Sequence, residues 1–229
     1  MRPPIYEPKG PAKEYGDLAC NLYTGCPHRC FYCFAPSVLH KDKETFHSKV
    51  EPRPGIVEEV GKQLSKEKIT GKLIHLCFTC DPYPTGYDTT VTRDVIRLMK
   101  YYGNHVQILT KGSGVRDFDL LDSKDWYGVT IDGKCEPDMY LAKYNDLSEA
   151  KSRGIKTWVS FEPVLDAQNV LRIIADYHDL MDRLKIGKLN YHKSDIDWKS
   201  FGKAVDKMCK FLDLDYYIKD SLREEMNRR

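Results

Sequence analysis

Short apolar runs alternate with longer amphipathic stretches along most of the chain. The amphipathic stretches repeat their apolar residues at helical spacing, as Val91, Val95, Leu98 and Tyr102 do within residues 88–102. The apolar runs have the length and composition of buried strands. They cover residues 18–24, 73–78, 106–109, 126–131, 155–161 and 184–189.

Each predicted strand is followed by a predicted helix, except that the first is separated from its helix by a cysteine-containing segment. The helices are expected from Pro54 onward, over 88–102, near 117–121, through Met139 to Leu147 with Gly154 as a C-terminal cap, through 170–177, and over 198–212. Six such alternations favour an α/β fold with a parallel sheet and right-handed crossovers. Eight would predict a closed barrel, whereas six predict a partial (β/α)6 TIM-like barrel.

The two ends of the chain depart from this pattern. Residues 1–17 contain four prolines and predict an extended N-terminal arm over the surface. The barrel is expected to cover residues 18–212, and residues 213–229 form a C-terminal extension. The run 214–219 within that extension is either an extra edge strand or a lid. We see no internal repeat and no long linker.

Composition adds few constraints. The 229 residues are 41% apolar and 31% charged, which is typical of a single soluble domain. The net charge of +2 neither favours nor excludes a nucleic acid partner. No apolar run is long enough to cross a membrane, and the N-terminus does not look like a signal peptide. We therefore expect a cytoplasmic protein without a membrane partner.

Three of the eight cysteines form a C-x3-C-x2-C array directly after the first predicted strand. Cys26, Cys30 and Cys33 reach a single centre without a long loop closure. Structural zinc usually takes four ligands in two separated pairs. Three cysteines in one loop suit a [4Fe–4S] cluster with one iron left open, because a fully ligated cluster takes four. An open iron can bind a substrate or cofactor.

A zinc site is the alternative for these cysteines. Its fourth ligand would be Cys20, His28 or the pair Cys77 and Cys80. In that case the chain would be a zinc-stabilised nucleic-acid-binding module without catalysis.

Polar residues gather after each of the predicted strands, where parallel α/β folds bind their ligands. They include carboxylates, amides and a lysine, and together with the cysteine loop they would line one rim of the sheet. Beyond the cysteine loop, the set comprises residues 79–83, Lys111, Asp132, Glu162, Asn190 and His192.

Four segments carry a resemblance to a known family. They are residues 21–33, 79–84, 109–117 and 154–165. In this order they resemble the radical S-adenosylmethionine superfamily, and more closely its spore photoproduct lyase-like (DNA repair photolyase-like) branch. The resemblance implies a partial barrel in which Cys26, Cys30 and Cys33 hold a [4Fe–4S] cluster. It also implies that S-adenosylmethionine chelates the fourth iron and is cleaved to a 5′-deoxyadenosyl radical, which abstracts a substrate hydrogen atom.

The resemblance also implies roles for residues on the rim. Lys111 is expected to pair with the cofactor carboxylate as a compact cation; the alternative is a surface lysine in a turn. The acids that precede prolines, Asp81 and Glu162, are expected to bind ribose hydroxyls or the sulfonium-bearing cofactor, or simply to stabilise chain reversals. The full set of expected cofactor-binding residues is Tyr32, Thr79, Cys80, Asp81, Lys111, Thr130, Asp132 and Glu162.

The expected catalytic residues are Tyr32, Cys77 and Cys80. Tyr32 resembles a position that packs near adenine or relays hydrogen atoms, and either cysteine is a candidate hydrogen donor. Two positions depart from the lyase pattern. Phe78 occupies the aligned cysteine position, and Phe34 replaces a tyrosine.

The substrate implied by the resemblance is a nucleobase in DNA or a nucleotide, which the enzyme would repair or modify. A peptide, an RNA or a metabolite is the alternative substrate. The electron donor implied for this chemistry is a flavodoxin- or ferredoxin-type reductant.

Overall fold

The computed structural model describes residues 3–135 and 140–228. The chain divides into two compact units, Met1–Tyr127 and Gly128–Arg229.

The first unit contains four strands that pair in the order of the sequence. The N-terminal β1 (Ile5–Tyr6) is antiparallel to β2 (Leu18–Cys20). The strands β3 (Leu73–Leu76) and β4 (His105–Thr110) continue the sheet, and the pairs β2–β3 and β3–β4 are parallel. The predicted parallel arrangement is confirmed for these pairs. The first and second predicted strands are shorter than expected, because pairing stops at Cys20 and Leu76.

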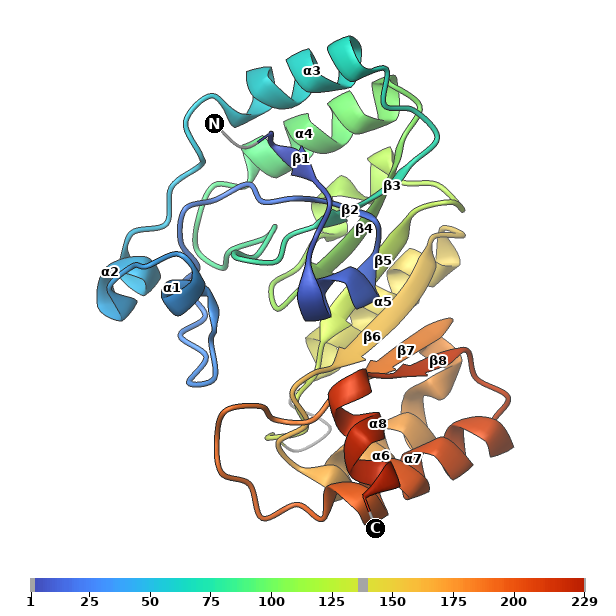
Figure 1. Cartoon of the computed structure of the whole chain (residues 1–229). Coiled ribbons are helices and arrows are strands. Elements are labelled where there is room, and N and C mark those ends of the chain that lie inside the picture. Colours follow the sequence, from blue (N-terminus) through green and yellow to red (C-terminus); the bar gives the residue numbers. More distant parts are fainter. Residues whose placement is uncertain (1–2, 136–139, 229) are drawn as a thin grey trace. The chain divides into compact units, whose positions relative to one another are not determined.

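Two helices of the first unit pack against each other beside its strands, as Figure 1 shows. They are α3 (Ile56–Glu67) and α4 (Thr90–Tyr101), and both were predicted from the apolar spacing. Their buried faces and the sheet form the core of this unit. The core side chains from these elements include Val60, Leu64, Ile74, Leu76, Val95, Ile96, Met99, Val106 and Ile108.

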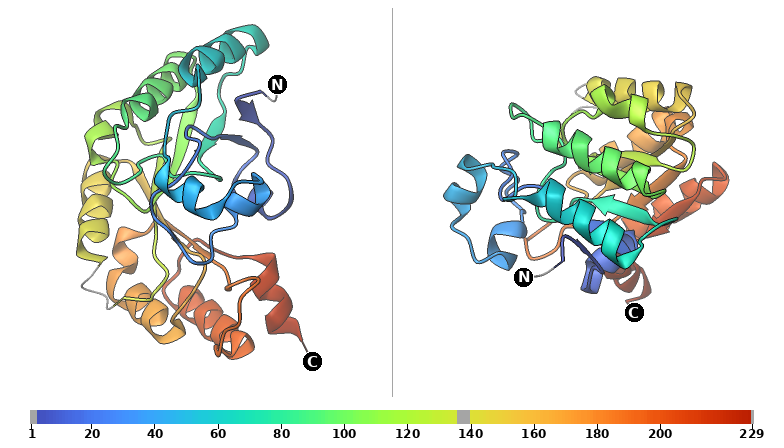
Figure 2. Two further views of the ribbon diagram at one scale, coloured as in Figure 1. Left: turned by 90° about the vertical axis from the view of Figure 1, so that its left-hand side faces the viewer. Right: turned by 90° about the horizontal axis from the view of Figure 1, so that it is seen from above.

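A segment between β2 and α3 carries two short helices that the sequence pattern did not predict. They are α1 (Ala35–Val38) and α2 (Lys43–Ser48), and they lie to one side of the strands of this unit (Figures 1 and 2). The carboxylate of Asp42 caps α2 by accepting a hydrogen bond of 2.8 Å from the backbone N–H of Thr45. Neither helix is long enough to show an amphipathic repeat, which is why the pattern missed them.

The N-terminal residues differ from the extended arm that the prolines predicted. Besides β1, they contain a 3-10 helix at Gly10–Tyr15. Ile5 is buried, and its backbone N–H and C=O bond to the amide side chain of Gln63 in α3 at 2.8 and 2.9 Å. Burial of Ile5 and the pairing of β1 with β2 thus tie the described part of this segment to the sheet.

The strands of the second unit are also parallel where their pairing is described. The strands β6 (Lys156–Phe161), β7 (Arg183–Ile186) and β8 (Tyr216–Ile218) pair in that order. The run 214–219 therefore contains an edge strand and is not a lid. A further strand, β5 (Trp126–Thr130), spans the division between the two units.

The described residues of the second unit form four α-helices. They are α5 (Leu141–Ser152), α6 (Ala167–Tyr177), α7 (Trp198–Phe211) and α8 (Asp220–Asn227). The first three were predicted, although the expected start at Met139 lies outside the described residues. Helix α8 was not predicted; it packs on α7 through its buried Leu222.

All eight described strands belong to one sheet in the order β1 to β8. The fold is therefore α/β with a mostly parallel sheet. Two short 3-10 helices, Val115–Leu120 and His178–Leu180, occur in the connections. Among the described helices, none combines the length and apolarity that crossing a membrane requires.

Candidate functional site

The cysteine loop leaves β2 at its carboxyl end and packs against α2. The backbone N–H of Cys26 donates to the carbonyl oxygen of Phe46 at 3.2 Å, and the N–H of Cys33 donates to Cys30 at 3.0 Å. Gly25 has no side chain for a structural reason, because a Cβ there would collide with the carbonyl oxygen of Phe46. This close approach fixes the position of the backbone directly before Cys26.

The three thiols are free and partly exposed. Around a single zinc ion, with Zn–S bonds near 2.3 Å, ligand sulfurs would lie about 3.8 Å apart. Cys26, Cys30 and Cys33 do not form a group with ligand atoms all within 4.8 Å of one another; in the described chain, only His105, Asp122 and Asp125 do. A [4Fe–4S] cluster binds each cysteine sulfur through a different iron, so its sulfurs do not need to meet around one ion.

Burial affects the protonation of two of these thiols. It raises the pKa of Cys26 and of Cys33 above the ordinary thiol value. The carboxylate of Asp81 and the neighbouring Cys80 also raise the pKa of Cys26. A bound metal centre would act in the opposite direction, because its positive charge stabilises the thiolate.

Asp81 anchors the loop after β3. Its buried carboxylate accepts hydrogen bonds from Tyr83 N–H and Thr110 Oγ1 on one oxygen, at 2.8 and 2.5 Å, and from Lys111 N–H on the other, at 2.8 Å. Nε2 of His28 lies 3.3 Å from the second oxygen. Asp81 thereby connects the cysteine loop to the ends of β3 and β4.

These contacts also determine the charge of Asp81. Burial raises the pKa of its carboxyl group, but His28 and the donors from Lys111 and Thr110 outweigh burial, so that the pKa lies below its usual value.

Lys111 and Tyr32 meet although 79 positions separate them. The ammonium group of Lys111 donates to the Tyr32 hydroxyl at 2.9 Å and lies 5.5 Å from the centre of its ring. The lysine is followed by Gly112, where a Cβ would collide with the backbone of Tyr83. The predicted lysine therefore lies beside the cysteine loop, held by a tight turn.

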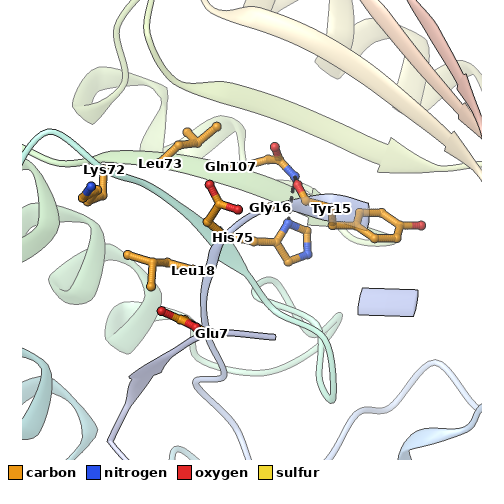
Figure 3. Close-up of a pocket in the computed structure, with 9 residues that line it drawn as sticks. Glu7, Tyr15, Gly16, Leu18, Lys72, Leu73, His75 and Gln107 are labelled. Atoms are coloured by element: carbon orange, nitrogen blue, oxygen red, sulfur yellow. Dashed lines mark hydrogen bonds between the residues drawn. The ribbon is translucent and has the colours of Figure 1, made fainter. Parts of the chain in front are cut away.

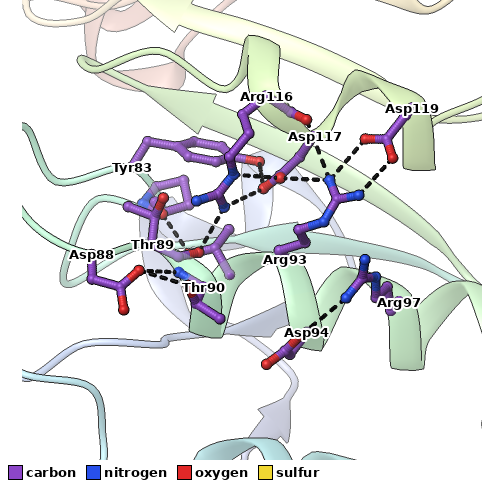
Figure 4. Close-up of polar contacts among 12 residues, drawn as sticks. Tyr83, Asp88, Thr89, Thr90, Arg93, Asp94, Arg97, Arg116, Asp117 and Asp119 are labelled. Atoms are coloured by element: carbon purple, nitrogen blue, oxygen red, sulfur yellow. Dashed lines mark hydrogen bonds and ion pairs between the residues drawn. The ribbon is translucent and has the colours of Figure 1, made fainter.

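An ion-pair network centred on the buried Asp117 includes Tyr83, which follows Asp81 in the loop after β3 (Figure 4). Asp117 is fully buried and accepts from the Tyr83 hydroxyl at 3.1 Å and from Arg93 at 3.0 Å. Arg116 also bonds to Asp117, and Arg93 extends to Asp119. Arg116 and Asp117, which belong to the third motif of the family resemblance, thus have structural contacts that account for them.

Thr79 presents a hydroxyl that no described group satisfies. The backbone N–H groups of Phe78 and Thr79 both donate to Oδ1 of Asn21, at 2.7 and 2.9 Å, which holds the turn after β3. The Oγ1 atom of Thr79 is shielded from solvent and makes no hydrogen bond. A buried hydroxyl without a partner is costly unless a ligand supplies one, so Thr79 fits a bound polar cofactor.

The two cysteines after β3 lie on either side of this turn. Cys77 is buried and Cys80 is partly exposed. The backbone N–H of Tyr23, just before the cysteine loop, points to the sulfur of Cys80 at 3.4 Å. Both cysteines are therefore at the carboxyl end of β3.

The remaining predicted residues belong to the second unit. Asp132 accepts from the Tyr140 hydroxyl at 2.8 Å, and Glu162 forms a 2.7 Å ion pair with the buried Lys219. Thr130 ends β5 and is partly exposed. Asn190 and His192 follow β7 in an irregular segment. The pairing of Glu162 with a lysine from the C-terminal extension could not be read from the sequence.

A cavity of about 300 Å³ lies elsewhere, at the amino ends of β2 and β3 (Figure 3). Its walls include Glu7, Leu18, Leu73 and Gln107, and it contains the His75 ring, whose Nδ1 lies 3.0 Å from Nε2 of Gln107. The cysteine loop follows the opposite, carboxyl end of β2.

Sequence reasoning did not predict the contacts by which four residues hold the site together. His28, Asn21, Thr110 and Tyr83 act through contacts with residues more than 25 positions away, or through a buried network. The signal that the sequence offered for them is that all four lie within the family-like segments 21–33, 79–84 and 109–117.

The candidate site thus combines three free thiols, an unsatisfied hydroxyl and a lysine next to a tyrosine, all in the first unit. No family model and no curated protein sequence matches this chain.

Proposed function

We propose that the protein is a radical S-adenosylmethionine enzyme. Cys26, Cys30 and Cys33 would hold a [4Fe–4S] cluster, which supplies the electron that cleaves S-adenosylmethionine to a 5′-deoxyadenosyl radical. The observation that supports the proposal is the C-x3-C-x2-C loop of free thiols at the carboxyl end of a parallel strand.

The chain's own residues would bind and orient the cofactor. The Lys111 ammonium group, beside the cysteine loop, would pair with the carboxylate of the methionyl part. Thr79 would satisfy its hydroxyl with a polar group of the cofactor. Asp81 would keep Lys111 and His28 in position. Tyr32, which belongs to the cysteine loop, would lie next to the cofactor when the cofactor binds the cluster.

The cofactor-binding roles expected for Thr130, Asp132 and Glu162 stay predictions from the resemblance; in the structure Glu162 pairs with Lys219. The finer fold that this function implies is a partial (β/α)6 barrel. A cytoplasmic location would suit a protein with eight free cysteines, and a flavodoxin- or ferredoxin-type carrier would supply electrons.

The proposed substrate is a nucleobase in DNA or a nucleotide. Phe34 is exposed and has no hydroxyl, so this side chain cannot return a hydrogen atom in the way that a tyrosine would. We therefore propose hydrogen abstraction from a nucleobase, and we do not propose the lyase reaction.

Anaerobic reconstitution tests the proposal. With iron and sulfide the protein should turn brown and bind about four irons per chain. Addition of a strong reductant and S-adenosylmethionine should then release 5′-deoxyadenosine. A colourless protein with stoichiometric zinc would contradict the proposal. Deuterium transfer from labelled DNA, nucleotides, RNA or peptides into 5′-deoxyadenosine would identify the substrate class.

Lys111→Met should weaken cofactor binding without removing the cluster. Loss of a charged hydrogen bond of about 1.5–3 kcal/mol predicts a roughly ten- to hundredfold higher S-adenosylmethionine concentration for half-maximal 5′-deoxyadenosine formation. The measurement is the rate against cofactor concentration at constant iron content. Lys66→Met, which changes an exposed lysine in α3, is the matched control. An unchanged concentration dependence for Lys111→Met would remove this lysine from the binding site.

A further inference from the structure

The first cysteine of the array is held from both sides by two consecutive residues of α2. The backbone N–H of Cys26 donates to the carbonyl oxygen of Phe46 at 3.2 Å, and the carbonyl oxygen of Cys26 lies 2.8 Å from Nδ1 of the His47 ring. These two groups belong to the peptide bonds before and after the Cα atom of Cys26. Holding both peptide planes determines the backbone dihedrals of Cys26, and with them the direction of its Cα–Cβ bond.

The chemistry of the contact determines which nitrogen of His47 acts as the donor. A carbonyl oxygen only accepts hydrogen bonds, so Nδ1 must donate. His47 is 4% exposed, and its ring lies edge-on against Phe46 with the ring centroids 5.1 Å apart. Nε2 is shielded from solvent and makes no hydrogen bond within the described chain. The ring is thus held in a buried position with Nδ1 directed at Cys26.

Helix α2 is a firm support for this contact. Asp42 caps its first turn by accepting hydrogen bonds from the N–H and the hydroxyl of Thr45, both at 2.8 Å, and Phe46 is buried. The backbone N–H of Thr24 donates to the carbonyl oxygen of Glu51 at 2.9 Å, which ties the chain before Cys26 to the segment after α2. The position of His47 is therefore fixed independently of the cysteines.

A second contact between the cysteine loop and α2 is of a different kind. The guanidinium group of Arg29 binds the carboxylate of Glu44 through hydrogen bonds of 2.7 and 2.5 Å, but the side chains are 52% and 70% exposed. Exposed ion pairs are screened by water and salt and hold their partners weakly. His47 is buried, so removal of its donor deprives the Cys26 carbonyl oxygen of a partner that water replaces less easily.

We propose that His47 is a positioning residue of the candidate cluster site. By donating its Nδ1–H to the Cys26 carbonyl oxygen, it holds the Cys26 sulfur in the orientation in which this sulfur would bind the cluster. The sequence pattern did not predict a role for His47. The role toward the cluster rests on the proposed function, whereas the hydrogen bond and its effect on Cys26 do not.

Four substitutions separate the hydrogen bond from the packing of the ring. His47→Leu fills the buried position without a donor. His47→Asn keeps a donor, because the amide nitrogen of asparagine is as far from the backbone as Nδ1, whereas His47→Gln places its amide nitrogen at the distance of Nε2. Glu44→Gln, which weakens the exposed pair with Arg29, is the control.

The first measurement uses the full chain without iron. Iodoacetamide alkylates the free thiols, and the tryptic peptide 14–29 is fragmented to compare Cys26 with Cys20, which is fully buried in β2. In His47→Leu we expect Cys26 to react several-fold faster than in the parent chain, while Cys20 stays protected. In His47→Asn and Glu44→Gln both cysteines should react as in the parent chain.

The second measurement follows iron after anaerobic reconstitution. Replacing residues that orient metal ligands typically weakens metal binding by about tenfold or more, so a chelator should remove iron from His47→Leu about tenfold faster than from the parent chain. His47→Gln should behave like His47→Leu, and His47→Asn like the parent chain.

Three results would overturn the proposal. They are unchanged reactivity of Cys26 in His47→Leu, equal loss of protection at Cys20 and Cys26, and rescue by His47→Gln but not by His47→Asn. The second result would make His47 a residue of the general fold, and the third would assign the effect to Nε2. A chain that takes up no iron contradicts the radical function instead, since alkylation decides without iron whether His47 holds Cys26.

Discussion

Replacing Cys30 with alanine should abolish the visible absorption of the reconstituted protein and reduce 5′-deoxyadenosine formation to the level without protein. The reason is the number of ligands. Three thiolates leave one iron of the cluster open for the cofactor, and removal of one leaves too few to hold the cluster. The measurements are iron content, the visible spectrum and chromatography of the nucleoside product.

The fold should survive this substitution. The Cys30 sulfur has only a weak contact of 4.0 Å with the carbonyl oxygen of His28. Thermal unfolding of Cys30→Ala should therefore resemble that of the parent chain. Cys135→Ser, which changes an exposed thiol outside the loop, should keep both colour and product. A brown Cys30→Ala variant that still released 5′-deoxyadenosine would show that the cluster lies elsewhere.

Asp81→Ala should destabilise the protein by about 3–5 kcal/mol, since it removes the acceptor of a buried charged network. The donors left without a partner are the N–H groups of Tyr83 and Lys111 and the Thr110 hydroxyl. Urea denaturation at neutral pH measures the difference in free energy of unfolding between the parent chain and the variant. We also expect less iron in the reconstituted variant, because Asp81 connects the cysteine loop to β4.

The contribution of Asp81 to the stability of the fold depends on pH in one direction. The folded-state pKa of Asp81 lies below that of the unfolded chain, near 3.9, so folding favours the ionised form. The stabilisation is fully present above the unfolded value and is lost as the pH falls through the lower folded value. The difference in free energy of unfolding between the parent chain and the Asp81→Ala variant should therefore become smaller at acidic pH.

A matched control separates burial from charge. Asp119→Ala removes an exposed carboxylate that pairs with Arg93, and exposed pairs contribute about 1 kcal/mol or less. If Asp81→Ala were no more destabilising than Asp119→Ala, Asp81 would not be an anchor.

Local patterns in the sequence predicted much of the fold. Helices α3, α4, α6 and α7 were found because their apolar stripes are long and regular, which follows from one buried face. The helices α1, α2 and α8 and the strand β1 were not predicted. They are short, and their stability comes from contacts such as the Ile5–Gln63 hydrogen bonds, which no local pattern encodes.

Some features of the candidate site likewise follow from local sequence, whereas others depend on tertiary contacts. The sequence alone determined the two cysteine groups, because neighbours within three or four positions are close together in any compact fold. Only the tertiary structure decided that Lys111 meets Tyr32, that Asp81 receives donors from β4 and the cysteine loop, and that Glu162 pairs with Lys219. These contacts depend on which strands are neighbours and in which register they pair, and both follow from the packing of the folded chain.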